Sequence, residues 1–337
     1  MGGIWVKNWQ KVTAALLLTA LLSGCASDQR VPETTEAVPE TTETVQTQPP
    51  ETIPIATEAA AMAEQPPPPA VPVVLEAEAS GERVQACEVA EVDYSHAEDG
   101  YVMARFTGET EKRLKVLLKG PSTTYNYNLP KGEWTVFPLS DGSGDYQLGI
   151  YRNVSGKQYA TVMAADFEAQ LTDEFAPFLR PNQYVDYSLA TKAVATGLEV
   201  TAGREHPLEK VEAVYDFVVA TLSYDEQKAK TVKSGYLPVL DEVLESQKGI
   251  CFDYAALMTA MLRSQEIPCK LVVGYAGSAY HAWISVWTEE SGWVDGAIFF
   301  DGHQWKRMDP TFASASQGDE KILDFIQNGK YKVKYLY

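Results

Sequence analysis

The last third of this 337-residue chain has the pattern of a helix followed by several strands. Three residues with reactive side chains lie on these predicted elements. Cys251 begins a segment whose apolar residues recur every three or four positions, the spacing of one buried helix face. His281 begins an alternating run to residue 287 that predicts a strand, and Asp309 ends another predicted strand that starts at Trp305. This order predicts an α+β unit with the cysteine at a helix start and the histidine on a strand facing it.

A thiol, an imidazole and a carboxylate are the components of an activated sulfur nucleophile. The imidazole takes the thiol proton, and the carboxylate holds the ring in one tautomer. At the first turn of a helix, unpaired backbone N–H groups and the positive end of the helix dipole favour a thiolate at Cys251. Gly249 allows the incoming chain to approach this turn closely. The pattern therefore predicts cysteine-dependent catalysis.

Three motifs around these residues resemble those of the transglutaminase-like superfamily, over about residues 208–312. The motifs are GICFDYA at 249–255, YHAW at 280–283 and MDPTF at 308–312. The resemblance implies a papain-like fold in which Cys251 is the nucleophile, His281 the general base and acid, and Asp309 the orienting carboxylate. One position departs from the family pattern, because Ser285 stands where an acidic residue often follows the motif tryptophan.

The resemblance implies acyl transfer or hydrolysis on protein or cell-wall peptide amides through a thioester, with no cofactor and no metal. The backbone N–H of Cys251 is one expected donor to the oxyanion. Tyr224, Tyr236 and Gln247 are candidates for the second donor. The alternative is a catalytically dormant transglutaminase-like module that binds ligands at the cell surface. It requires a packed cysteine, a satisfied strand histidine and a turn-forming aspartate at the three positions.

The first 24 residues have the organisation of an export signal. Lys7 and Lys11 precede an apolar core at residues 12–22, which is too short to span a bilayer comfortably. The sequence LSGC that ends at Cys25 resembles a bacterial lipobox, which implies a lipid-modified Cys25. An ordinary secretory signal or a short anchor helix would also suit the small residues there. We expect an extracytoplasmic, lipid-anchored protein, and the order of its parts resembles that of exported Gram-positive surface proteins.

Residues 25–80 form a predicted disordered linker. From residue 26 to 80 there is no Phe, Trp or Tyr, and the sequence VPETTE at 31–36 recurs at 38–43. Such a segment buries too little apolar surface to offset the entropy of ordering, and its prolines favour an extended spacer. We expect the linker to hold the folded part away from the membrane.

The charge of the chain excludes two classes of partner. Asp and Glu number 46 against 28 Lys and Arg, which gives a formal net charge of −18. Nucleic-acid binding needs basic patches that displace counterions, and electrostatic docking on anionic lipids needs basic clusters. We therefore expect a protein or peptidoglycan-peptide substrate, no nucleic acid, and membrane contact only through the lipid.

The four cysteines fit an exported protein with a free thiol. With Cys25 assigned to lipid, Cys87, Cys251 and Cys269 remain, and an odd number leaves at least one thiol unpaired. Cys269 and Cys87 are predicted to be small core residues. A bridge between them would have to link two domains. The Cys and His spacings do not resemble a zinc site.

Two folded domains are predicted after the linker. Residues 85–171 show short alternating runs separated by turn residues, which predicts an antiparallel, immunoglobulin-like β-sandwich with a spacer or binding role. Residues 172–337 form the transglutaminase-like domain, with predicted helices over 188–200 and after His206, and a final edge strand over 331–337. The fold class is therefore α+β, with a β-sandwich before a papain-like unit.

Overall fold

The computed structural model describes residues 71–295, 298–300, 305–307 and 331–337, the two short ranges near residue 300 as backbone only. The chain from Pro66 to Tyr337 forms one compact unit. Its fold is mixed α+β with mostly antiparallel strands. Cys25 and Asp309 lie outside the described residues. The boundaries predicted for the signal, linker and two domains stay predictions.

The N-terminal half consists of two four-stranded antiparallel sheets. The first has the strand order β1 (Val84–Cys87), β2 (Ala90–Asp93), β3 (Tyr101–Phe106), β6 (Thr135–Pro138). The second has the order β5 (Thr124–Asn128), β4 (Leu114–Lys119), β7 (Gly144–Ser155), β8 (Gln158–Ala169). Short 3₁₀ turns lie at Ala97–Asp99 and Ala176–Phe178. Apolar side chains of both sheets belong to the same buried core.

Strand positions in this half agree with the alternating sequence pattern, while two strand lengths do not. The alternating run at residues 101–106 predicts a strand, and β3 covers it. The runs at 146–151 and 158–162 predict shorter strands than β7 and β8, which have twelve residues each and pair along most of their length. The prediction that Cys87 is a core residue is wrong, because it lies exposed at the end of β1. Every residue of that short strand except Gln85 is exposed, so the position offers little to pack against.

In its described residues, the C-terminal half has five helices packed around one four-stranded antiparallel sheet. The helices are α1 (Lys192–Val200), α2 (Pro207–Thr221), α3 (Glu226–Thr231), α4 (Leu240–Ser246) and α5 (Cys251–Arg263). The sheet has the order β13 (Gly292–Asp295), β12 (Ala279–Thr288), β11 (Cys269–Ala276), β16 (Tyr331–Leu336). Two small pairs complete it: parallel β9 (Ser223–Tyr224) with β10 (Lys248–Gly249), and antiparallel β14 (Ile298–Phe300) with β15 (Trp305–Arg307).

The sequence located most of these elements. α2 begins at Pro207, and the ring of His206 accepts a hydrogen bond from the N–H of Leu208, as expected of a residue at a helix start. The predicted final strand is present as β16 at the edge of the sheet beside β11. Among the described residues, no helix combines the length and the apolar character needed to cross a membrane.

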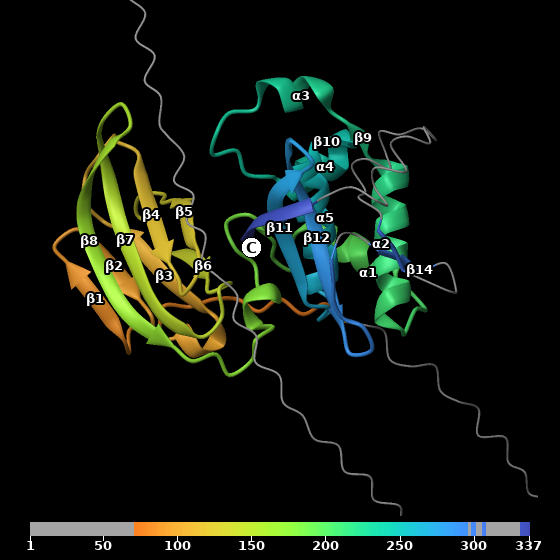
Figure 1. Cartoon of the computed structure of the whole chain (residues 1–337), viewed down its shortest axis with the longest axis horizontal. Helices are drawn as coiled ribbons and strands as arrows, with labels where there is room; N and C mark the ends of the chain where they lie inside the picture. The colour runs from red at the N-terminus through yellow and green to blue at the C-terminus, as the bar shows by residue number, and fades with distance from the viewer. Residues whose placement is uncertain (1–70, 296–297, 301–304, 308–330) are drawn as a thin grey trace, which may run out of the picture. The chain divides into compact units, whose positions relative to one another are not determined.

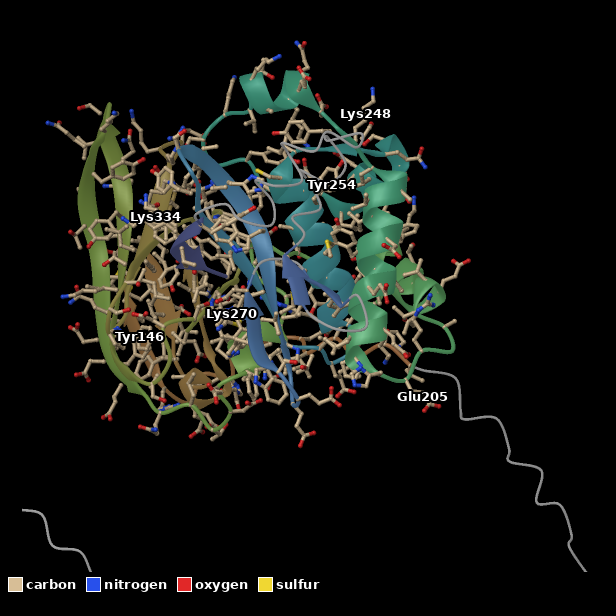
Figure 2. The ribbon with its side chains drawn as sticks, turned by 45° about the vertical axis from the view of Figure 1, so that its right-hand side comes forward. Tyr146, Glu205, Lys248, Tyr254, Lys270 and Lys334 are labelled. Atoms are coloured by element: carbon tan, nitrogen blue, oxygen red, sulfur yellow. The ribbon has the colours of Figure 1, made fainter. Side chains whose placement is uncertain are left out.

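Helix α5 is the centre of this half and is buried on every side. It packs against β11 and β12 on one side and against α1, α2 and α4 on the other (Figure 1). All residues from Asp253 to Arg263 are buried, including Tyr254, which lies inside the fold in Figure 2. The prediction of one buried face is therefore too narrow, because the sheet covers the opposite face of the helix as well.

Arg263 ends this helix as a fully buried cation bonded to backbone oxygens. Its guanidinium donates to the carbonyl oxygens of Cys269 at 2.9 Å, Arg180 at 2.6 Å and Tyr337 at 2.7 Å. Burial lowers the pKa of Arg263 below its usual value, because burial penalises the charged form. The arginine therefore joins α5 to β11, to the residue after β16 and to the segment before α1.

Aromatic rings join the two halves of the unit. Tyr337, which follows β16, packs against Tyr184 with ring centroids 4.0 Å apart and against Tyr127 of β5 at 5.8 Å. Beside them, the Gln183 side chain accepts from the Asn128 N–H at 3.1 Å and donates to its carbonyl at 2.8 Å. The strand β5 thus lies against the C-terminal half and supplies side chains to its surface.

Candidate active site

Cys251 is the first residue of α5, as the sequence predicted. The chain reaches it through Gln247, which has left-handed geometry with φ of 52°, and through β10, which pairs with β9. A Cβ on Gly249 would lie 2.7 Å from the Cβ of Asp253, so a side chain there would force the first turn apart. The predicted close approach at Gly249 is confirmed, and it delivers a partly exposed Cys251 to the start of the helix.

Asp253 closes the same turn from within a hydrogen-bond network. Its buried carboxylate accepts from the N–H of Ile250 at 2.7 Å, from the Tyr236 hydroxyl at 2.6 Å and from the Lys228 ammonium at 2.8 Å. Such a carboxylate satisfies a backbone donor that the helix leaves unpaired and places negative charge at the positive end of its dipole. The network fixes the turn that carries Cys251.

His281 lies on β12 and is almost fully buried, at 6% exposure. It pairs with Gly274 of β11 across the sheet. A Cβ on Gly274 would lie 2.1 Å from the backbone oxygen of Lys332 and 2.8 Å from the Trp283 ring. Because Gly274 has no side chain, β16 can lie close to β11, the strand that pairs with His281 of β12.

Cys251 and His281 line one cleft of about 630 Å³. Backbone and side chains from both halves of the unit form its walls. The other lining residues are Lys115, Asn126, Asn128, Tyr184, Tyr224, Ala229, Val232, Lys233, Ser234, Gly235, Tyr236, Ile250, Phe252, Val273, Tyr280, Ala282, Tyr335 and Tyr337. The structure thus brings two of the three predicted catalytic residues to the same cavity, while Asp309 falls outside the described residues.

The three side chains considered as second oxyanion donors differ in position. Tyr224 and Tyr236 line the cleft with Cys251, whereas Gln247 is the residue that ends α4 and is not among the lining residues. Burial, followed by the hydrogen bond to Asp253 and its charge, raises the pKa of Tyr236 well above its usual value. Tyr236 therefore keeps its proton and donates a hydrogen bond to Asp253.

The backbone N–H of Cys251 accords with its expected role as an oxyanion donor. As the first N–H of a helix it has no acceptor within the helix. No acceptor for it lies elsewhere in the described part of the chain. It is thus available to an oxyanion that forms beside the cysteine.

Ser285 faces a carboxylate from the neighbouring strand. Its hydroxyl donates to Asp295 at 2.8 Å, and the two residues are paired across β12 and β13. An acidic group therefore stands beside the position where the superfamily often has one, although it comes from another strand. Ser285 is buried and is not among the residues that line the cleft.

The sequence analysis missed Lys228, and it did not identify the role of Asp253. The signal for Asp253 is its position: an acidic residue three positions after the residue that precedes a predicted helix often accepts a hydrogen bond from that residue's backbone N–H. Lys228 carries no comparable signal, since only the folded chain brings α3 to α5. Within the described ranges, no group of three or more His, Cys, Asp or Glu side chains could hold a metal ion.

Comparison with known proteins places these features in a family. The family model described as the transglutaminase-like superfamily matches residues 194–296, a range that includes Cys251 and His281 and ends before Asp309. The chain carries a transglutaminase-like domain. The recognition made from the three motifs is thereby confirmed.

The chain also has relatives of known sequence and structure. It is 28% identical over 98 residues to a protein-glutamine gamma-glutamyltransferase of Pseudomonas aeruginosa, and 25% identical over 126 residues to the uncharacterized protein YebA of Bacillus subtilis. These matches cover 25% and 32% of this chain, but only 13% and 17% of the relatives. The periplasmic domain of TgpA from Pseudomonas aeruginosa aligns over 73% of this chain and 100% of its own, at 15% identity and a TM-score of 0.33.

Proposed function

We propose that this protein is a cysteine-dependent acyltransferase or hydrolase that acts on carboxamides of proteins or cell-wall peptides. The observation that carries the proposal is the shared cleft. Cys251 at the start of α5 and His281 on β12 both line it, within a domain matched to the transglutaminase-like superfamily. In this proposal Asp309 orients the imidazole.

The reaction proceeds in two acyl transfers. The Cys251 thiolate attacks the carboxamide carbon, and the oxyanion of the tetrahedral intermediate accepts a hydrogen bond from the Cys251 N–H. The amine or ammonia leaves with a proton from His281 and a thioester remains. An amine or water then attacks the thioester, gives its proton to His281, and releases the product and the thiolate.

The remaining parts of the chain support a surface location in this proposal. We infer that the two N-terminal sheets form an immunoglobulin-like sandwich; their strand orders and common core support it. We infer in addition that Cys25 carries lipid and that residues 26–80 separate the folded unit from the membrane of a Gram-positive cell.

Competition between thiols of the same chain tests the catalytic proposal. Cys87 is exposed and serves as an internal reference. With limiting iodoacetamide at pH 7, we expect Cys251 to be alkylated about tenfold faster than Cys87, and His281→Ala to remove the difference. Burial raises the pKa of Cys269 to about 11, so Cys269 stays unlabelled. Mass spectrometry of peptides from each position gives the rates.

The acyl-transfer step needs a second measurement. A glutamine peptide is incubated with the protein and a labelled primary amine, and product is followed alongside released ammonia. Labelled product indicates transamidation, and ammonia without label indicates hydrolysis. If Cys251 is alkylated no faster than Cys87 and neither product forms, the domain is a dormant binding module.

A further inference from the structure

The charged groups of the catalytic cleft are of one sign. Apart from Cys251 and His281, its titratable lining residues within the described chain are lysines and tyrosines, and none is Asp or Glu. The lysines are Lys115 and Lys233. This is unusual in a chain of net charge −18, where acidic residues outnumber basic ones. The cleft is therefore a local exception to the charge of the molecule.

Lys115 reaches the cleft from β4 of the N-terminal half and has no counter-ion among the described residues. It lies between Asn128 of β5 and Tyr151 of β7 in the sheet, and no described carboxylate lies within 4.0 Å of its ammonium. Burial, with a smaller effect of the Arg113 charge, lowers the pKa of Lys115. An ammonium that is partly removed from water and has no partner among the described residues is stabilised when a carboxylate binds to it.

The cationic wall continues beyond the catalytic cleft. A second cavity of about 420 Å³ shares Lys115, Asn128, Ser234 and Gly235 with the cleft. Its other lining residues are Thr110, Lys112, Arg113, Leu114, Leu129, Pro130 and Lys131. The described lining of this cavity has four cationic side chains and no carboxylate.

Two acidic residues near this surface neutralise only part of its positive charge. Glu109 forms an ion pair with Lys131 at 2.8 Å, so Lys131 is already partly neutralised. Glu111 lines a third cavity next to Lys112 and Arg113. Lys115, Arg113 and Lys112 have no ion-pair partner within the described residues. These three side chains form the cationic groove; they come from β4 and the two residues before it and line the second cavity.

We propose that the cationic groove selects acyl donors in which the reactive carboxamide belongs to a peptide carrying carboxylates. Lys115 pairs with the carboxylate nearest the reacting amide, and Arg113 and Lys112 with those further along. Lys115 is a specificity-determining residue of the reaction, and this role rests on the proposed function. The N-terminal half thereby supplies part of the substrate site.

Binding to the Cys251→Ala protein tests the groove without requiring chemistry. The probes are two fluorescent glutamine peptides that differ only by Asp→Asn exchanges beside the glutamine, measured by anisotropy at low salt. We expect the acidic peptide to bind about tenfold more tightly, since one ion pair in a partly buried site gives a difference of this order. Raising the salt concentration should reduce the preference.

Two further variants assign the preference to Lys115. In the Cys251→Ala protein, Lys115→Gln should abolish most of the preference for the acidic peptide, whereas Lys115→Arg should retain the preference. Lys119→Gln removes the same charge from the same strand at an exposed position that lines neither cavity, and it should leave the preference unchanged. A thermal melt of each variant shows that the fold persists.

The outcomes separate the two proposals. Equal binding of both peptides, no binding of either, or equal loss in the Lys115 and Lys119 variants overturns the groove. Selective binding of the acidic peptide together with an inert Cys251 in the alkylation experiment overturns the catalytic proposal and leaves the groove standing.

Discussion

At the scale of single residues, the site depends on partners that hold the cysteine rather than on the cysteine alone. Asp253 is fully buried, whereas the Lys228 side chain keeps 27% exposure. The carboxylate therefore depends on its partners, while the ammonium can turn to water. Removing one member of a buried pair is costly when the other charge stays buried, and much less so when it can be solvated.

This asymmetry predicts different costs for the two halves of the pair. Lys228→Met leaves the buried carboxylate without its cation, and we expect the free energy of unfolding to fall by about 3–5 kcal/mol. In Asp253→Asn, the amide oxygen still accepts from Ile250 and the NH₂ group donates to Tyr236, so we expect a loss of about 1–2 kcal/mol. Urea unfolding of both variants measures these two losses. A larger loss in Asp253→Asn than in Lys228→Met would contradict this account of the network.

At the scale of elements, α5 and β12 bring Cys251 and His281 to the same cleft. The period of the apolar residues predicted a helix with one buried face, and the structure buries all of its faces. Sequence periodicity reports how apolar residues are spaced, but the number of layers around a helix depends on segments distant in the chain. α1 and α2 are such segments, and only their packing shows that α5 is central.

Arg263 shows what the burial of this helix requires. We expect Arg263→Met to lower the free energy of unfolding by about 3–5 kcal/mol, because three carbonyl oxygens lose their donor inside the protein. Arg204→Met is the matched control, since Arg204 is exposed and donates to a single carbonyl, and its effect should stay within about 0.5 kcal/mol. Thermal or urea unfolding compares the two, and similar costs would show that Arg263 is dispensable.

At the scale of the whole molecule, the two folded halves act as one unit. Tyr127 and Tyr184 pack on Tyr337, and Asn128 exchanges hydrogen bonds with Gln183. Aromatic contacts of this kind add free energy beyond the area that they bury. The contacts hold β4 and β5 beside Cys251, which is why strands of the N-terminal half can line the cleft that contains Cys251.

The proposed membrane attachment rests on Cys25, which lies outside the described residues, and labelling tests it directly. We expect metabolic labelling of the expressing bacterium with a fatty acid to label the wild-type protein, and Cys25→Ala to lose both the label and membrane retention. Cys87→Ala is the control, since that exposed thiol lies in the folded unit. An unlabelled wild type would remove the lipid anchor from the proposal.

The sequence by itself determined the local features of this protein. The positions of β3, α2 and β16, the start of α5 at Cys251 and the membership in a superfamily follow from periodicity, from turn and capping residues, and from short motifs. These signals are carried by neighbouring residues, so no tertiary contact is needed to read them. The same holds for Cys269, whose apolar surroundings in sequence predicted the buried thiol.

Only the tertiary structure decided how distant residues combine. Lys228 meets Asp253 across α3 and α5, and Lys115 reaches the cleft of Cys251 from a strand more than a hundred residues earlier. Nothing local marks such partners, because a charged residue on a strand or short helix looks the same whether it faces solvent or a site. Lys115 lines the cleft only because the N-terminal half packs against the C-terminal half.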